Sequence, residues 1–399
     1  MIYILGHAVV SPLGYTTEEH CRAIVAGQSS IMPYPAGTMG VPFPFSASLF
    51  DSLLLEERAA GYCGAMTHMY GKVQQALELA FGQAVNSSID NFFKSQIYNN
   101  KRILFVVCAN KGGVELLEKK DQMTFPPQIY PWHIVQRMMA EHGVVSEPIV
   151  LTNSAVTGAY GFQIAQEMLE STDRFDYVVL CGVELVPQRT LAGFHTMGVL
   201  SETRCKPFDV TRNGMNLGEA AACVILASEK AYRRDKHAYV KASHTMFVKG
   251  ACCNDAYDVS KPYLLGEGLY RSLKKVLANT SLKEIAFVNA FANGTVTGDN
   301  SESIALERAG LSKIPVTSYK ANLGYSSGAS GLVDCLISLK ALENDLVLPT
   351  LGCEKVGVDG RIDVVKTTRH IPSNKTSFLK VSRGYGGVNS ASLFTKFSE

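Results

Sequence analysis

The sequence has no apolar run long enough to cross a bilayer, because no stretch approaches the roughly 18 apolar residues that a spanning helix needs. Its first residues, MIYILGHAVVSPLG, lack the basic segment that opens a signal peptide and have the pattern of a strand followed by a turn. We therefore expect no membrane span, no signal peptide and a cytoplasmic location.

An excess of charge is also missing. The 38 basic and 36 acidic residues leave a formal net charge of +2, which argues against nucleic acid or a membrane surface as a partner. The ten cysteines are scattered, with one adjacent pair, Cys252-Cys253, and no C-x-x-C spacing. This pattern predicts neither a disulfide framework nor a metal site. Gly112-Gly113 follows a predicted strand but fits no phosphate-binding motif, so we expect no cofactor.

The chain does contain enough apolar material for a large core. It has 399 residues, of which 46% are hydrophobic and 19% are charged, a balance typical of globular proteins and not of disordered chains. Length alone allows one large domain or two fused halves.

The most informative stretch is residues 148–170, PIVLTNSAVTGAYGFQIAQEMLE. Residues 148–152 form a short apolar run typical of a buried strand, residues 153–158 are small, and helical spacing begins at Ala159. A strand, turn and helix of this kind place a residue at the positive end of the helix dipole. A nucleophile there gains a lowered pKa and a nearby oxyanion hole, so the stretch fits a nucleophile turn. It equally fits an ordinary strand–helix turn of any α/β protein.

The remaining pattern predicts alternating strands and helices. Strands are predicted at 1–10, 101–109, 175–182, 221–228, 285–290, 314–318, 377–381 and 390–397. Helices are predicted at 16–26, 52–86 with an interruption near residues 61–64, 266–278, 301–310 and 328–342. Residues 30–50 are predicted to be irregular, and residues 121–148 to form a loop with a small core of its own. Because the order of elements repeats, we expect two halves, 1–240 and 241–399.

Several motifs along the chain resemble those of the β-ketoacyl-acyl-carrier-protein synthases. The opening V-S-P-L-G is present at residues 10–14, and the D-A-Y…P segment at residues 255–262. The P-F-D-x-x-R-D-G-F-x-x-G-E-G motif is matched most specifically, by residues 207–220. The resemblance spans essentially the whole chain. It implies a duplicated thiolase-like α/β/α/β/α sandwich made of two ketosynthase-like halves.

The resemblance also implies that the three reactive groups of the family are absent. The family's nucleophile motif, N-A-C-x-[ST]-G, corresponds to residues 153–158, which place Ala155 at the cysteine. The two histidine motifs correspond to residues 288–295 and 320–331, which place Phe291 and Tyr325 at the histidines. A shift of register cannot restore them, because no histidine lies between His244 and His370.

Other family positions are kept. Lys320 matches the family lysine, and Asp334 stands where the family usually has the glutamate that pairs with it, so we expect a buried ion pair. By the same resemblance Thr157, Tyr385 and Gly386 are assigned to substrate binding, the last two in a G-Y-G-G version of the family's G-F-G-G.

These matches leave three functional alternatives. The first is a non-catalytic subunit resembling the chain-length factors, paired with an active β-ketoacyl synthase in type II polyketide, aryl-polyene or fatty-acid biosynthesis. The common chain-length-factor residue at the nucleophile is Gln, which this chain lacks. The second is an active synthase with unusual residues or with an engineered Cys→Ala change at Ala155. The third is a free-standing acyl-binding protein. The expected partners are an active synthase or a second copy, together with acyl carrier protein.

Overall fold

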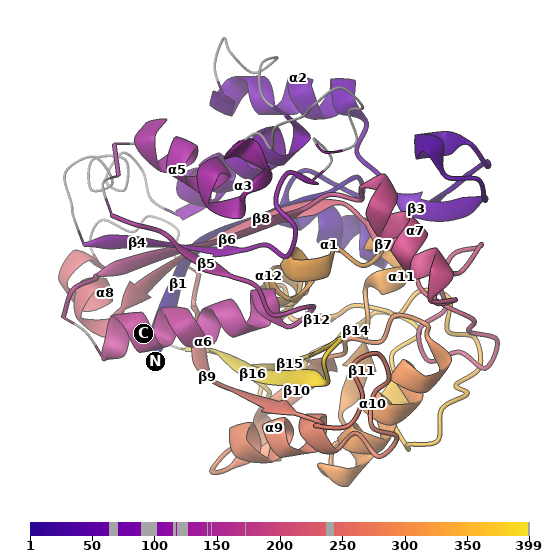
Figure 1. The fold of residues 1–399 in the computed structure, drawn as a ribbon. Helices are drawn as coiled ribbons and strands as arrows, with labels where there is room; N and C mark the ends of the chain where they lie inside the picture. Colours follow the sequence, from indigo (N-terminus) through magenta and orange to yellow (C-terminus); the bar gives the residue numbers. More distant parts are fainter. Residues whose placement is uncertain are drawn as a thin grey trace.

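The computed structural model describes residues 1–63, 71–88, 102–114, 117, 127–141, 143–144, 146–171, 173–236 and 243–397. One sheet of eleven strands runs through the molecule in the order β13-β11-β10-β15-β16-β9-β1-β8-β6-β4-β5 (Figure 1). Two smaller sheets pair β12 with β14, and β2 with β3 and β7.

The large sheet consists of two groups of strands with the same topology. The first is β1 (Ile2–Val10), β8 (Ala220–Ser228), β6 (Tyr177–Glu184), β4 (Ile103–Cys108) and β5 (Ile149–Leu151). The second is β9 (Thr245–Asn254), β16 (Val388–Lys396), β15 (Ser377–Gly384), β10 (Ile285–Asn289) and β11 (Pro315–Thr317), to which β13 (Asp363–Val364) is added. In each group the three strands nearest the edge of the sheet are parallel to one another: β5, β4 and β6 in the first group, and β11, β10 and β15 in the second. The two strands nearest the centre of the sheet are added by antiparallel pairing. This repeat is the duplication predicted from the sequence.

The two groups are joined into one sheet where β1 pairs with β9, at Ile2 with Phe247 and at Tyr3 with Met246. Helices fill three layers around them (Figure 1). The outer layer on the first group contains α2 (Ser52–Cys63), α3 (Lys72–Ser88) and α5 (Pro131–Glu141). The middle layer contains α1 (Thr17–Val25), α6 (Thr157–Glu170) and α12 (Ser330–Glu343), and the other outer layer contains α9 (Glu267–Leu277) and α10 (Val296–Arg308).

Hydrophobic cores fill the spaces between the layers. The central core joins α6 and α12 to the inner faces of both strand groups, for example through Phe162 and Leu336. A second core lies under α3 and a third under α9. The two strand groups alternate with three helical layers, which gives the α/β/α/β/α sandwich, so the predicted fold class is confirmed.

The middle helices approach closely at their first turns because glycine stands at both contact points. A Cβ atom on Gly158 would lie 2.3 Å from the backbone nitrogen of Leu332, and one on Gly331 would lie 2.7 Å from that of Ala159. This crossing sets the predicted nucleophile turn directly beside the second half of the chain.

Some local predictions were wrong. Residues 30–50 are not wholly irregular, because they contain β2 (Met32–Tyr34), η1 (Thr38–Gly40) and β3 (Phe45–Ser48), which pairs with β7 (Leu217–Gly218). Within 121–148 the described part contains η4 (Pro127–Ile129) and α5 instead of a loop; residues 121–126, 142 and 145 lie outside the described residues. The interruption predicted near residues 61–64 also falls largely on residues 64–70, which are not described.

The structure adds elements that we did not predict, namely β9 and α7 (Gln188–Thr196). The other elements are α8 (Glu229–Asp235), α11 (Lys320–Leu323), η6 (Leu282–Glu284), η7 (Ser327–Ala329), β12 (Leu346–Val347) and β14 (Arg369–His370). None of the helices in the described part of the chain is long and apolar enough to cross a membrane.

Candidate functional site

The predicted nucleophile turn connects β5 to α6. Ser154 adopts a left-handed conformation (φ 51°), which turns the chain sharply before the helix. The Thr157 hydroxyl donates to the carbonyl oxygen of Ser154 (2.6 Å) and accepts the backbone N–H of Asn153 (2.7 Å). Asn110 donates to the same carbonyl from the neighbouring strand end (3.0 Å). These bonds fix the turn and bury the methyl group of Ala155.

A cavity of about 110 Å³ opens beside this turn. Its apolar wall contains the three residues predicted for the reactive positions, together with an aromatic residue of the G-Y-G-G segment and two aliphatic side chains: Ala155, Phe291, Tyr325, Tyr385, Val199 and Met215. Its polar wall contains Asp255, Lys261, Asn293, Arg383 and Asn389, among others. The structure therefore brings Ala155, Phe291, Tyr325 and Tyr385 together from four distant parts of the sequence.

The aromatic side chains contact one another around this cavity. The Phe291 and Tyr325 rings meet edge to face, with centroids 5.7 Å apart and planes at 81°. Phe194 of α7 packs behind them, 6.3 Å from Tyr325 and 5.8 Å from Tyr385. Edge-to-face contacts of this kind are favourable because ring edges are positive and ring faces negative. The rings thus form a packed wall and leave no imidazole in the cavity.

The tyrosine hydroxyl in this wall is a weak acid. Burial raises the pKa of Tyr325 above its ordinary value, and the nearby Glu184 carboxylate raises it further. Tyr325 therefore keeps its proton at neutral pH and cannot act as a base there.

The loop that presents Phe291 is held by two buried carboxylates of α10. Glu302 accepts the backbone N–H groups of Phe291 (2.7 Å) and Ala292 (2.9 Å). Asp299 accepts those of Phe208 (2.7 Å) and Asn293 (3.1 Å). Burial raises the pKa of Asp299 to about 7, although its N–H donors favour the ionised form. The position of the Phe291 ring thus depends on charged groups behind it.

Behind the aromatic wall lies a buried cluster of charges. Lys320 and Lys380 both bond to Asp334, Lys380 at 2.7 Å, and Lys380 also donates to Asn289 (2.6 Å). Burial lowers the pKa of the Lys320 ammonium, although the Asp334 carboxylate favours its charged form. Burial also disfavours the charge on Asp334, but the two ammoniums hold its pKa below the ordinary value. The expected Lys320–Asp334 pair is present, and the structure adds Lys380 to it.

Two predicted substrate-binding residues do not line the cavity. Thr157 is fully buried, and its hydroxyl is engaged within the turn. Gly386 donates its N–H to the Val259 carbonyl (2.7 Å), and its own carbonyl accepts from Asn254 (2.8 Å). These contacts favour a role in shaping the loops, so a part in substrate binding stays a prediction for both.

Sequence reasoning missed three residues that build the site. Lys380 lies in the strand predicted at 377–381 and Arg383 lies two residues beyond it, and both are buried in β15. A cation inside an otherwise apolar strand was the available signal for Lys380. Phe194 gave no signal, because its helix α7 buries only Leu191. In the described part of the chain, no group of three or more His, Cys, Asp or Glu side chains is arranged to hold a metal ion.

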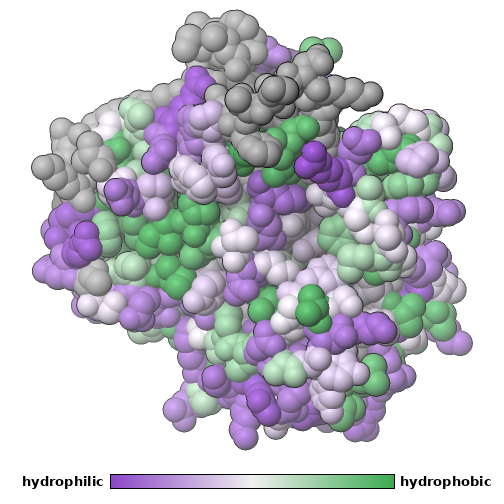
Figure 2. Space-filling view, viewed as in Figure 1, coloured by the Kyte–Doolittle hydropathy of each residue, from purple (hydrophilic) through white to green (hydrophobic). Residues whose placement is uncertain are grey.

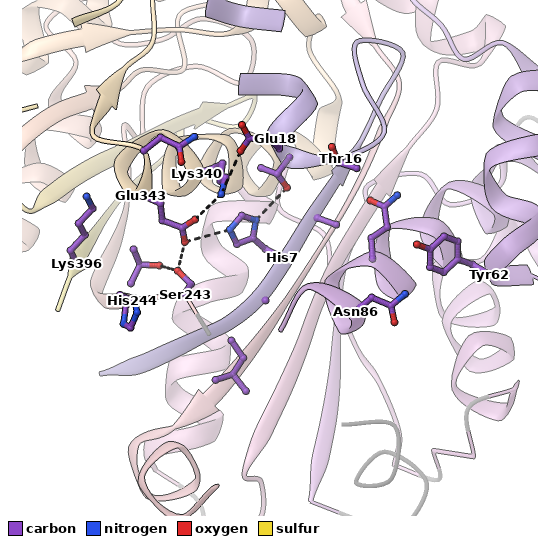
Figure 3. Close-up of a pocket in the computed structure, with 17 residues that line it drawn as sticks. His7, Thr16, Glu18, Tyr62, Asn86, Ser243, His244, Lys340, Glu343 and Lys396 are labelled. Atoms are coloured by element: carbon purple, nitrogen blue, oxygen red, sulfur yellow. Dashed lines mark hydrogen bonds and ion pairs between the residues drawn. The ribbon is translucent and has the colours of Figure 1, made fainter. Parts of the chain in front are cut away.

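A larger cavity of about 830 Å³ lies elsewhere, where β1, α1 and the end of α12 meet (Figure 3). Its charged side chains point toward one another: Lys340 lies between Glu18 (3.4 Å) and Glu343 (3.5 Å), and Ser243 bonds to Glu343. Because none of the residues predicted from the motifs lines it, we take the smaller cavity beside Ala155 as the candidate site.

Comparison with known proteins finds matches along the whole chain. A family model described as "Beta-ketoacyl synthase, N-terminal domain" matches residues 148–231, and one described as "Beta-ketoacyl synthase, C-terminal domain" matches residues 246–354. The 3-oxoacyl-[acyl-carrier-protein] synthase 2 of Vibrio cholerae is 24% identical to this chain, and the match covers 99% of each of the two chains. That of Coxiella burnetii is also 24% identical, over 99% of this chain and 98% of its own.

Solved structures share the fold over the full length. A β-ketoacyl synthase from Burkholderia phymatum has a TM-score of 0.83 at 20% identity and covers 100% of this chain and 99% of its own. The ishigamide ketosynthase/chain length factor has a TM-score of 0.81 at 19% identity with the same coverage. A ketosynthase in complex with its chain length factor from Xenorhabdus doucetiae has a TM-score of 0.78 at 18% identity. The match covers 99% of this chain and 98% of that one. The two matching domain models, the full-length relatives and the shared architecture establish that the chain belongs to the β-ketoacyl synthase family.

Proposed function

We propose that this chain is a non-catalytic subunit of the chain-length-factor type, which pairs with an active β-ketoacyl synthase and shapes the acyl tunnel of the pair. The observation that carries the proposal is Ala155 on the turn between β5 and α6, faced by the packed rings of Phe291 and Tyr325. Polyketide, aryl-polyene and fatty-acid biosynthesis are the pathways in which we place it, in the cytoplasm.

The chemistry of condensation has requirements that these residues do not meet. A nucleophile must take the acyl chain as a thioester, and a methyl group cannot. Donors must then stabilise the negative charge that grows on the malonyl thioester oxygen as carbon dioxide leaves. Phe291 has no hydrogen-bonding group, and the Tyr325 hydroxyl is a poor substitute for imidazole because burial raises its pKa.

The edge of the sheet supports pairing with a second chain. β5 ends the eleven-stranded sheet, and its residues Ile149, Val150 and Leu151 are partly exposed. Figure 2 shows apolar residues gathered on the surface over this strand. An apolar strand at a sheet edge has unpaired backbone groups and is a ready surface for strand pairing. We propose that an active synthase or a second copy pairs here, beside the nucleophile turn, and that acyl carrier protein is a further partner of the pair.

We also propose that the boundary between the duplicated halves lies near residue 240, which gives the units 1–240 and 241–399. The last strand of the first half, β8, and the first strand of the second, β9, lie on either side of it.

The pairing is tested by sedimentation of the chain alone and with its cognate synthase. We expect a dimer in at least one of the two samples. An Ile149→Lys variant should weaken it, because a charge would be buried in the interface, whereas Lys283→Glu on the far outer layer should not. A stable monomer in both samples would contradict the proposed pairing.

The absence of chemistry is tested separately with acyl- and malonyl-carrier protein. The isolated chain should show neither transacylation nor carbon dioxide release above a control without protein. Release above this control would favour the second candidate, an active synthase, which is supported by the names of the full-length relatives. An engineered Cys→Ala change at Ala155 belongs to that second candidate.

A further inference from the structure

The strand β9 has one edge that is only partly paired. It pairs with β16 over its length, but on its other side β1 pairs with it only at Met246 and Phe247. Next to this contact the Gln166 side chain donates to the Val248 carbonyl oxygen (3.1 Å). In the described part of the chain no strand pairs with the outer side of residues 249–254. This free edge spans about 20 Å, the length of a short strand.

The backbone groups of this edge point outward at every second residue. Asp255 donates its N–H to the carbonyl oxygen of Gly387, which continues the register between β9 and β16. Because hydrogen-bonded and non-hydrogen-bonded pairs alternate along an antiparallel ladder, the backbone groups of Gly250, Cys252 and Asn254 face away from β16. Among the described residues these three N–H groups have no backbone acceptor. An unpaired edge of this kind is a template for a further strand.

A groove of about 690 Å³ lies beside this edge. It is lined by residues of β9 and of α9, which lies alongside the strand (Figure 1). The strand contributes Cys252, Cys253 and Asn254, and the helix side ends at Ala278. These residues are short, so the backbone of an added strand can come close to β9. The groove therefore fits an extended chain that runs along the strand.

The helix side of the groove is basic. Arg271 is offset by Glu267 (2.9 Å). Lys274 and Lys275 are exposed, and they have no ion-pair partner in the part of the chain that the structure describes. The side chain of Asp255, directly after the strand, is buried beside an arginine of its own. The groove therefore has an excess of positive charge, which favours an acidic partner.

We propose that the free edge of β9, together with the basic groove beside it, binds an acidic extended segment of a partner protein by strand addition. The segment pairs with Gly250, Cys252 and Asn254, and its acidic side chains face Lys274 and Lys275. Backbone pairing gives such a complex its affinity, and the lysines select acidic over basic segments. The inference goes beyond the proposed function, because this edge belongs to the second strand group, whereas the pairing proposed above uses β5 of the first.

The proposal is tested by fluorescence anisotropy of the full chain with a fluorescein-labelled peptide of three Glu-Val repeats. We expect a Kd on the order of 100 μM. Affinity should fall as sodium chloride rises from about 50 to about 500 mM, because salt screens exposed charges. A peptide of three Lys-Val repeats should bind about tenfold or more weakly. Equal binding of the two peptides, or no binding of the acidic one at about 1 mM, would overturn the proposal.

Two N-methylated forms of the acidic peptide test the strand pairing itself. One has methyl groups on the glutamate nitrogens and the other on the valine nitrogens, so their charges are the same. A peptide added to one edge points only alternate N–H groups toward it, and a slip by one residue turns the glutamates away from the lysines. One form should therefore bind like the parent peptide, and the other should not bind. The same affinity for both forms would mean attraction by charge alone and would contradict strand addition.

Variants of the chain locate the site. Lys275→Glu should weaken the acidic peptide about fivefold, because an exposed attraction becomes a repulsion. Lys313→Glu is the matched control and should change nothing, since this exposed lysine directly precedes β11, on the far side of the second strand group from β9. Unchanged affinity in Lys275→Glu would place the peptide elsewhere and overturn the proposal.

A further variant removes one outward N–H group. Cys252→Pro should abolish peptide binding, and proline is tolerated on a strand edge where its missing N–H faces solvent. Should this variant fail to fold, the N-methylated peptides test the same contact on the unchanged chain. Affinity that falls as the concentration of the chain is raised would mean that a second copy covers the edge, and the proposed acidic partner would then be wrong.

Discussion

The two sides of the Phe291 ring differ in the polar groups that they contain. On one side lie Lys320, Asp334 and Lys380, buried and joined by ion pairs. On the other side lies the cavity, whose wall at Ala155 and Tyr325 has no nucleophile and no imidazole. Lys380 also donates to the carbonyl oxygen of Ala290 (3.3 Å), directly before Phe291, so the charged cluster contacts the loop beside the cavity. Under the proposed function, the reactive groups of a synthase are replaced in this chain while the charged scaffold behind them is kept.

The largest effect should come from breaking the charged side. Asp334→Ala leaves two buried ammoniums without their shared carboxylate, and breaking a buried pair in this way typically costs about 3–5 kcal/mol. We expect an aggregated or strongly destabilised protein, measured as a fall in the free energy of unfolding in urea. Asp345→Ala, which breaks an exposed pair with Lys396, is the control and should cost less than about 1 kcal/mol.

A second variant distinguishes charge from packing at the same place. Replacing all three residues, as Lys320→Met, Asp334→Leu and Lys380→Met, removes the ammoniums together with the carboxylate and should recover much of the lost stability. Equal losses for Asp334→Ala and Asp345→Ala would mean that the buried cluster does not hold the site.

The next effect concerns the cavity side. Ala155→Cys restores a thiol at a helix N-terminus, where cysteine pKa values fall, so the variant should react with iodoacetamide or accept an acyl chain. Condensation should stay on the order of 100- to 1000-fold below that of an ordinary synthase, because the donors to the oxyanion are still missing. Product formation from acyl- and malonyl-carrier protein, without a partner, measures this.

The triple variant Ala155→Cys, Phe291→His, Tyr325→His sharpens the test. If the charged cluster still positions the loops, the triple variant should condense the substrates faster than Ala155→Cys alone. Ordinary turnover by Ala155→Cys alone would mean that Phe291 and Tyr325 do not stand at the catalytic positions, and would contradict the placement of both motifs.

The carboxylates under Phe291 should make stability depend on pH. The pKa of Asp299 is raised from 3.8 in the unfolded chain to about 7 in the folded one, first because of burial. The folded state then binds one proton more between these values, so the contribution of Asp299 to stability is full below pH 4 and is lost as the pH rises to 7. Asp299→Asn should remove about one proton from this dependence, measured as the difference between variant and parent in urea midpoints from pH 4 to 8. Identical pH slopes would show that Asp299 is already ionised in the folded protein.

The strands could be predicted from composition, and the four cavity residues from the resemblance of their motifs, including Gly384-Tyr385-Gly386-Gly387, to those of the family. Buried strands such as β6 and β10 are continuous apolar runs, and the motifs at 153–158, 288–295 and 320–331 fix residue offsets. Elements with mixed composition were missed: β9 includes Lys249 and Gly250, and α7 buries only one residue. The partners of Asp334 depend on contacts between distant segments. Lys380 reaches it from 46 residues away, which local periodicity does not encode.

The smallest effect should come from the Tyr325 hydroxyl. Tyr325→Phe keeps the ring, and with it the edge-to-face contacts with Phe291 and Phe194, so the wall stays packed. Only one hydrogen-bonding group is lost, and a net hydrogen bond contributes about 1 kcal/mol. We expect a change in unfolding free energy of that size or less, whereas Tyr325→Ala should cost about 3–5 kcal/mol through the space left in the core. In an Ala155→Cys background, Tyr325→Phe should leave the residual condensation rate unchanged, because a hydroxyl whose pKa is raised by burial contributes little to proton transfer. A further fall of tenfold or more would show that Tyr325 donates to the reacting thioester, and the cavity side would then retain part of its chemistry.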